Sequence, residues 1–98
     1  MYFVISGRDR PDALEKRKET RAAHLSYWGD LGADLKLAGP YLDENGNPTG
    51  SLIIIEAPTI VAARTYAEAD PYVTQGVFES VGVTEWMWAV NAPEKADS

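Results

Sequence analysis

The sequence predicts a single α+β domain in which four strands and two helices follow one another in the order β-α-β-β-α-β. Three observations support this prediction. The chain has 98 residues, the length of one domain. It contains short apolar segments rich in β-branched and aromatic residues, which are typical of strands. Two segments, at residues 12–32 and 60–69, carry the start and stop signals of helices instead.

The first strand and the first helix are separated by a clear break. Residues 2–7 are short and apolar and predict the strand. Asp12, followed three residues later by Glu15, has the spacing of a capping box, with aspartate in place of serine or threonine. This spacing predicts a helix that begins there and runs to about Gly32.

The second strand is expected at residues 35–42. Because this segment contains Gly39 and Pro40, we expect it to lie at an edge of the sheet or to carry a bulge. The polar cluster that follows contains Asn45 and Gly46, a pair that is typical of hairpin turns.

The third strand is expected at residues 51–57, and it leads into the second helix. Thr59 can cap a helix that spans residues 60–69. Asp70 and Pro71 should end this helix, because the residue before a proline is disfavoured in helical angles.

The fourth strand should lie within residues 78–90. We expect one domain over residues 1–90 and a disordered polar tail over residues 91–98. The order of elements is the ferredoxin-like plan, in which two helices cover one face of a four-stranded antiparallel sheet.

The other face of this sheet is expected to be covered by a second copy of the chain. A strand with one wet face alternates apolar and polar residues, but residues 52–55 and 86–90 do not alternate. Leaving such side chains exposed would forfeit about 1.5–3 kcal/mol each. The sequence therefore favours a homodimer joined through the sheet face, a dimeric α+β barrel. Bulges, or packing of the chain end against the first helix, would explain the same runs.

Composition excludes several classes of function. Fifteen acidic against nine basic residues give a net charge of −6, which disfavours nucleic-acid binding. A single histidine and no cysteine cannot form a standard zinc site, although a carboxylate cage for magnesium stays open. We expect no metal and no cofactor. Since neither a secretory signal nor a membrane span is visible, we expect a cytoplasmic protein that does not bind membranes.

The first helix carries the strongest functional signal. Four of its side chains fall within an arc of about 60° on the face expected to pack on the sheet; they are Arg17, Arg21, His24 and Trp28. Polar residues at inward positions are costly unless they are paired or lie in a wet cavity, so the pattern indicates a site. The alternative is that both arginines extend to water and that His24 is a hydrogen-bonded core residue.

Asp70 is the second candidate. It is expected at the C-terminal end of the second helix, where the helix dipole disfavours a carboxylate. Ordinary turn chemistry explains an aspartate before a proline equally well.

Three segments of the chain resemble the YCII-related (YciI-like) family. They are Leu14-Glu15-Lys16-Arg17 with Arg21 and Ala23-His24-Leu25, then Leu37-Ala38-Gly39-Pro40, and then Ala69-Asp70-Pro71-Tyr72-Val73 with Gly76-Val77-Phe78-Glu79. The resemblance implies a ferredoxin-like fold assembled as a dimeric α+β barrel. It also implies a proposed catalytic dyad, which maps onto His24 and Asp70. Some relatives are linked to loss of HCl from chlorinated aromatic compounds.

We therefore expect an enzyme in which His24 is a general acid or base and Asp70 holds its tautomer. The reaction class would be isomerisation or elimination on a small anionic or aromatic molecule. Two other hypotheses stay open at this point: a non-catalytic dimeric module that binds a small ligand, and a structural dimer without a site.

Further residues are expected to bind the substrate beside this dyad. They are Arg17, Arg21, Trp28, Gly39, Pro40 and Tyr72. The arginines would supply positive charge to a carboxylate or enolate. The tryptophan would form a wall of an apolar pocket, approached by the Gly39-Pro40 backbone.

Overall fold

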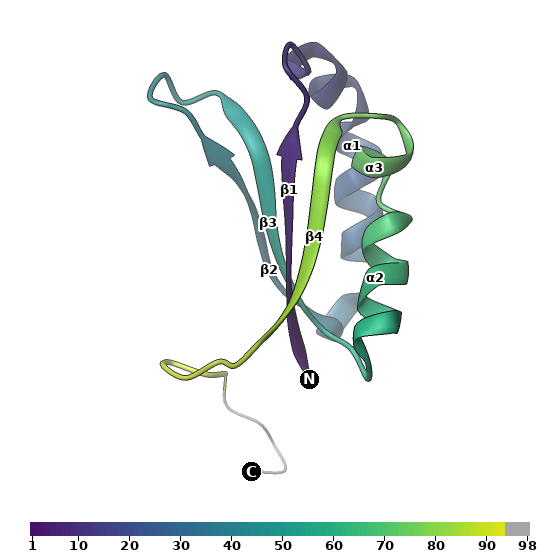
Figure 1. Ribbon diagram of the computed structural model, residues 1–98, viewed down its shortest axis with the longest axis vertical. Helices are drawn as coiled ribbons and strands as arrows, with labels where there is room; N and C mark the ends of the chain where they lie inside the picture. The colour runs from purple at the N-terminus through teal and green to yellow at the C-terminus, as the bar shows by residue number, and fades with distance from the viewer. Residues whose placement is uncertain (94–98) are drawn as a thin grey trace.

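The computed structural model describes residues 1–93, which form a four-stranded antiparallel sheet with helices on one face (Figure 1). The elements are β1 (Tyr2–Asp9), α1 (Leu14–Gly29), the 3-10 turn η1 (Gly32–Asp34), β2 (Leu35–Leu42), β3 (Pro48–Glu56), α2 (Ile60–Glu68), α3 (Pro71–Thr74) and β4 (Phe78–Trp86). The strand order is β2-β3-β1-β4. The predicted ferredoxin-like fold is confirmed. No helix within residues 1–93 is long and apolar enough to cross a bilayer. Part of the predicted tail, residues 94–98, lies outside the described residues.

The core lies between the sheet and the helices. Phe3 and Ile5 of β1 are fully buried and pair with Ile55 and Ile53 of β3. Trp28 of α1 and small alanines of α2 close this core from the helix side. Each large apolar side chain buried here contributes about 1.5–3 kcal/mol to stability.

A close approach of Phe78 to β1 positions α3. Gly7 has no side chain where the Phe78 ring lies, and an added Cβ would collide with that ring. On its other side the Phe78 ring packs edge-on against Tyr72 of α3, with ring centroids 5.5 Å apart. The glycine therefore lets one aromatic ring join β1 to the short helix that carries Tyr72.

The predicted bounds of α1 were wrong at both ends. Asp12 has a left-handed φ of 60°, and the helix is capped by Ala13 without any side-chain hydrogen bond. The predicted capping box therefore does not form, because the aspartate lies outside the cap position. The helix ends at Gly29 instead of Gly32, since Gly32 takes a positive φ and begins the 3-10 turn.

The hairpin of β2 and β3 follows the sequence closely. β2 is an edge strand, which confirms the first of the two predicted alternatives. Its pairing with β3 shifts register between Leu35 and Leu37 and between Tyr41 and Leu42, and not at Gly39 and Pro40. β3 begins at Pro48, three residues earlier than predicted, because the pairing with β2 extends further toward the turn.

Asp70 does not act as a C-terminal residue of the second helix. α2 begins as predicted, with the Thr59 side chain accepting a hydrogen bond from the Ala62 amide at 3.1 Å. After α2, the Asp70 carboxylate caps the next helix and accepts a hydrogen bond from the Tyr72 amide at 2.9 Å. Pro71 takes the first helical position, where its missing N–H leaves no bond unmade. The expected conflict with a helix dipole is therefore absent.

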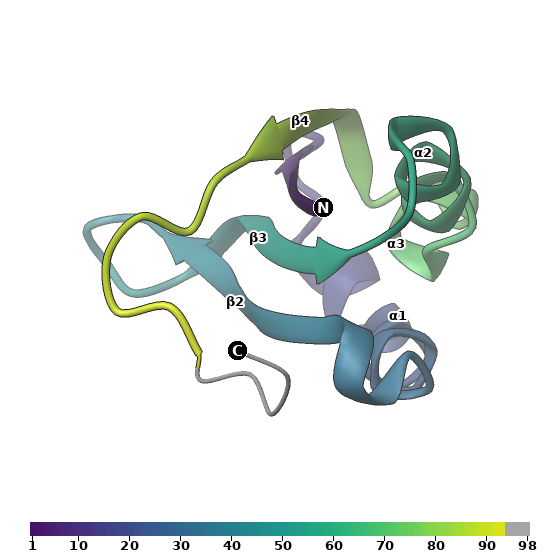
Figure 2. The same cartoon turned by 90° about the horizontal axis from the view of Figure 1, so that it is seen from below.

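The sheet face away from the helices is called the open face here (Figures 1 and 2). Ile54 lies on it and is nevertheless only 6 % exposed. β4 lies within the predicted residues 78–90, but of the other apolar run, residues 86–90, only Trp86 belongs to it. The chain beyond it turns to the open side, where Tyr2 packs against Trp86 and Trp88 at centroid distances of 6.3 and 5.7 Å. One of the two runs that predicted a covered face is thus explained by packing near the chain end.

Candidate functional site

A cavity of about 410 Å³ lies between α1, the β2–β3 hairpin and α3, and is called the α1 cavity below. Six of the predicted site residues line it; they are Arg17, Arg21, His24, Gly39, Pro40 and Tyr72. The remaining two, Trp28 and Asp70, lie behind the His24 ring and do not line the cavity.

His24 and Asp70 are in direct contact. His24 Nδ1 lies 2.8 Å from Asp70 Oδ1, and the side chains are only 7 % and 1 % exposed. Because an ionised carboxylate can only accept, Nδ1 is the atom that donates to an ionised Asp70. Within residues 1–93, Nε2 makes no hydrogen bond and is not sealed from solvent. The free ring nitrogen is therefore the one available to the cavity.

The Asp70 carboxylate accepts from two further donors. The Trp28 indole Nε1 donates to Oδ2 at 3.0 Å, and the Tyr72 amide donates to Oδ1 at 2.9 Å. His24 and Trp28 lie four residues apart on α1, one helical turn, so both can reach the same carboxylate. The prediction that Trp28 forms a wall of the pocket was wrong: its ring belongs to the core, and its N–H holds Asp70.

Tyr72 joins the histidine to the arginines. Its ring stacks on the His24 imidazole at a centroid distance of 3.7 Å and an interplanar angle of 11°. The Arg17 guanidinium carbon lies 4.6 Å from the centre of the Tyr72 ring. Burial raises the pKa of the Tyr72 phenol, against the opposing effect of Arg17 and Arg21. The phenol is therefore protonated at neutral pH and presents a neutral hydroxyl to the cavity.

Arg17 is already paired within the chain. Its guanidinium donates to both carboxylate oxygens of Asp9, at 2.7 and 3.1 Å, and to the Ser51 hydroxyl at 2.8 Å. The Arg17 and Asp9 side chains are each 7 % exposed. Since Asp9 balances this charge, the predicted role of Arg17 as a free cation for substrate is weakened. The Arg21 side chain makes no hydrogen bond or ion pair within residues 1–93, and its charge lies at the cavity without a counter-ion.

Two members of this polar cluster were missed in the sequence. Neither Asp9, at the end of the first strand, nor Ser51, at the start of the expected third strand, was predicted as a site residue. Their separations from Arg17, of 8 and 34 residues, follow no periodicity of helix or strand. An aspartate next to a predicted strand end, facing an inward arginine, was the single available signal.

No group of three or more histidine, aspartate or glutamate side chains within residues 1–93 is arranged to hold a metal ion. The expectation that the protein needs no metal or cofactor stays a prediction.

The fold and this cavity together define a ferredoxin-like α+β protein with a histidine–aspartate pair beside a cavity of small-molecule size. The chain belongs to the YCII-related domain family, whose model matches residues 1–87. It is 41% identical over 91 residues to Protein YciI of Escherichia coli O6:H1, covering 85% of this chain and 93% of that protein. An uncharacterized protein of Haemophilus influenzae is 40% identical over 89 residues, covering 83% and 91%.

One solved structure is similar in both sequence and fold. It is 5-chloro-2-hydroxyhydroquinone dehydrochlorinase (TftG) from Burkholderia phenoliruptrix AC1100 in complex with 2,5-dihydroxybenzoquinone, with a TM-score of 0.81 and 34% identity. The match covers 89% of this chain and 94% of that one. An antibiotic biosynthesis monooxygenase, at 14% identity and a TM-score of 0.53, covers 89% of this chain and 99% of that one and shares the fold alone. The YCII fold is thus shared with an enzyme that acts on a small molecule.

Proposed function

We propose that the α1 cavity is an active site in which His24 moves a proton on a small anionic or aromatic molecule. The observation that carries this proposal is the hydrogen bond from His24 Nδ1 to Asp70, which leaves Nε2 toward the cavity. A neutral Nε2 can take a proton, and the resulting imidazolium can return it. Isomerisation and elimination are the reaction classes that require only such a transfer of a proton.

Asp70 and Arg21 have separate roles in the proposed mechanism. Asp70 fixes the ring tautomer and stabilises the imidazolium once Nε2 has gained a proton. It is itself held by two other N–H donors, so it need not move during the reaction. Arg21, unpaired at the cavity, would meet a carboxylate or an enolate oxygen as negative charge develops there. Arg17 would orient Tyr72 instead of contacting the substrate.

We further propose hydroxylated aromatic or quinone compounds as the substrate class. The support is the dehydrochlorinase, which is 34% identical to this chain and was solved with 2,5-dihydroxybenzoquinone. In an elimination, the base removes a proton while the leaving group departs with its bonding electrons. In the proposed mechanism, Nε2 of His24 takes that proton.

We expect the protein to bind 2,5-dihydroxybenzoquinone and to accelerate exchange of its ring hydrogens with D₂O. Replacing His24 with glutamine should slow this exchange at least about 100-fold, because glutamine has no ring nitrogen that can take up and return a proton. Proton NMR in D₂O measures the exchange, and thermal unfolding checks that the variant is folded. Lys16→Gln, an exposed change elsewhere on α1, serves as the control and should keep the full rate.

The alternative function is a non-catalytic dimeric module that binds a small ligand in the same cavity. Binding without accelerated exchange would favour this module. Exchange that is equally fast in His24→Gln would contradict the proposed role of the histidine. Failure to bind would overturn the proposed substrate class.

We also propose that two copies of the chain associate through the open face. Leu37 of β2 is 41 % exposed on this face, and Ile54 lies beside it in the register of the sheet. Ile54 is already buried within the single chain, so the gain on association comes from Leu37, up to about 1.5–3 kcal/mol if a partner covers it fully. A cytoplasmic location is part of the same proposal.

We expect light scattering to give twice the mass of the chain at micromolar concentration. Leu37→Glu should convert the protein to a monomer, because the partner would have to bury an unpaired carboxylate. The matched control is Val61→Glu, at a 68 % exposed site on α2, away from the open face, and it should remain dimeric. A monomer mass for the unchanged protein would contradict the association.

A further inference from the structure

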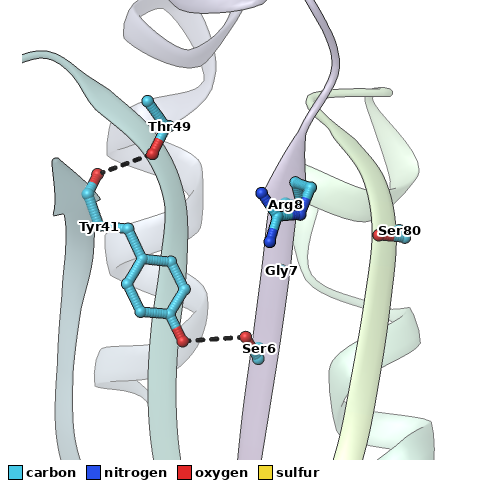
Figure 3. A pocket seen from close by; sticks show the side chains of 6 residues that line it. All are labelled: Ser6, Gly7, Arg8, Tyr41, Thr49 and Ser80. Carbon is cyan, nitrogen blue, oxygen red and sulfur yellow. Dashed lines mark hydrogen bonds between the residues drawn. The ribbon is translucent and has the colours of Figure 1, made fainter. Parts of the chain in front are cut away.

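A second hollow, of about 410 Å³, lies on the open face and is called the Arg8 hollow below (Figure 3). Its lining residues come from all four strands; they are Ser6, Gly7, Arg8, Tyr41, Thr49 and Ser80. It shares no lining residue with the α1 cavity, which lies on the helix side of the sheet.

The lining combines one cation with several hydroxyl groups. Ser6 Oγ and Tyr41 Oη are 2.9 Å apart, and the Thr49 hydroxyl donates to the Tyr41 carbonyl at 3.5 Å. In Figure 3 the Arg8 side chain lies between the hydroxyl groups of Ser6 and Tyr41 on one side and Ser80, on the neighbouring strand β4, on the other. No carboxylate belongs to the lining. The hollow therefore offers N–H and O–H donors with no acidic side chain to compete for them.

Arg8 differs from the two arginines nearest to it in sequence. Arg17 is paired with Asp9, and Arg10 donates to the Gly76 carbonyl at 3.1 Å. The Arg8 side chain makes no hydrogen bond or ion pair within residues 1–93. In a chain with a net charge of −6, an unpaired guanidinium among hydroxyl groups is a local positive site.

We propose that the Arg8 hollow binds the carboxylate or phosphate group of a small molecule, at a site separate from the α1 cavity. A guanidinium presents its N–H groups in a planar fork that matches two oxygens of such a group. Ser6 and Ser80, on either side of Arg8, can donate to the remaining oxygens. Because the oxyanion would contact β1 and β4 together, its binding does not depend on the fold of any loop.

Association of two chains through the open face would strengthen the need for an anion. Arg8 would then be covered by the partner, and a buried charge without a counter-ion is strongly unfavourable. An oxyanion held with the guanidinium removes this penalty. We therefore expect phosphate to tighten the dimer by mass action, because it binds the associated form better than the separate chains.

The test is an NMR titration of the whole protein with inorganic phosphate, with acetate and with chloride at matched ionic strength. We expect saturable shifts of the Arg8 guanidinium and of the Ser6 and Ser80 amides with phosphate, with acetate or with both. Chloride should leave these signals in place, and the His24 ring signals should not move. Tighter binding of phosphate would indicate a phosphorylated ligand, and tighter binding of acetate would indicate a carboxylate ligand.

Arg8→Gln should weaken this binding at least tenfold, because it keeps a hydrogen-bond donor but removes the charge. Arg64→Gln, which removes an exposed arginine from α2, is the matched control and should bind as the native protein does. Shifts that do not saturate, or that survive in Arg8→Gln, overturn the proposal.

A second measurement distinguishes two possible occupants of the Arg8 hollow, a small anion and a side chain from a second copy of the protein. In the Leu37→Glu variant, phosphate should still saturate the Arg8 hollow. If phosphate has no effect there and Arg8→Gln alone changes the mass of the native protein, the hollow receives a side chain of the partner, and the proposal is wrong.

Discussion

Replacing Asp70 with alanine is expected to lower the free energy of unfolding by about 4 kcal/mol. The carboxylate is 1 % exposed and accepts from three N–H groups, two from side chains and one from the backbone. Alanine leaves the His24, Trp28 and Tyr72 donors buried without a partner, and each unsatisfied donor costs about 1–3 kcal/mol. Urea unfolding monitored by tryptophan fluorescence measures the change.

Two further variants isolate the cause. Asp70→Asn keeps the volume and one accepting oxygen, so we expect it to lose about half as much stability as the alanine variant. Asp30→Ala removes an exposed aspartate just after α1 and should change stability by less than about 0.5 kcal/mol. A loss of under about 1 kcal/mol for Asp70→Ala would mean that water satisfies the three donors, and the carboxylate would not be a fixed part of the site.

The second large effect is expected at Asp9. Asp9→Ala leaves the Arg17 guanidinium 7 % exposed without its counter-ion, and breaking a buried pair in this way costs about 3–5 kcal/mol. The Ser51 hydroxyl and the Tyr72 ring still contact Arg17, so a value near the lower end, about 3 kcal/mol, is expected. Chemical unfolding at neutral pH is the measurement.

A double-mutant cycle shows whether this loss comes from the pair. Arg17→Met alone leaves the Asp9 carboxylate buried without a counter-ion. Asp9→Ala combined with Arg17→Met removes both charges, so its loss of unfolding free energy should be far smaller than the sum of the two single losses. Glu15→Ala, at the exposed pair with Lys18, should change stability by less than about 0.5 kcal/mol. Additive losses in the cycle would contradict a buried, coupled pair.

These two expectations concern the same feature of the molecule. Between α1, α3 and the sheet, polar and charged groups replace part of the apolar core. Arg17 is held by Asp9 and Ser51, and Asp70 is held by three N–H donors. Such groups stabilise the fold only when all of them are satisfied. The proposed catalytic histidine therefore lies in a region that is costly to build and rigid once it is complete.

The helix face shows how far the sequence could lead to the site. Spacing of four, three and four residues along α1 placed Arg17, Arg21, His24 and Trp28 on one inward face, and all four lie on the side of α1 that meets the sheet or the cavity. The spacing could not assign their partners. It gave Trp28 a place in the pocket wall, whereas its N–H is turned inward to Asp70.

The sequence by itself determined the order of the elements, the edge position of β2 and the inward face of α1. Each of these follows from local signals, namely periodicity, turn residues and proline, which act over a few neighbouring residues. Only the tertiary structure decided that Asp70 accepts from His24, 46 residues away, and that Asp9 neutralises Arg17. Which polar groups satisfy one another is set by the packing of α1 on the sheet, where an unpaired buried charge is too costly to remain. A contact between residues so far apart in the sequence does not produce a periodic pattern from which it could be predicted.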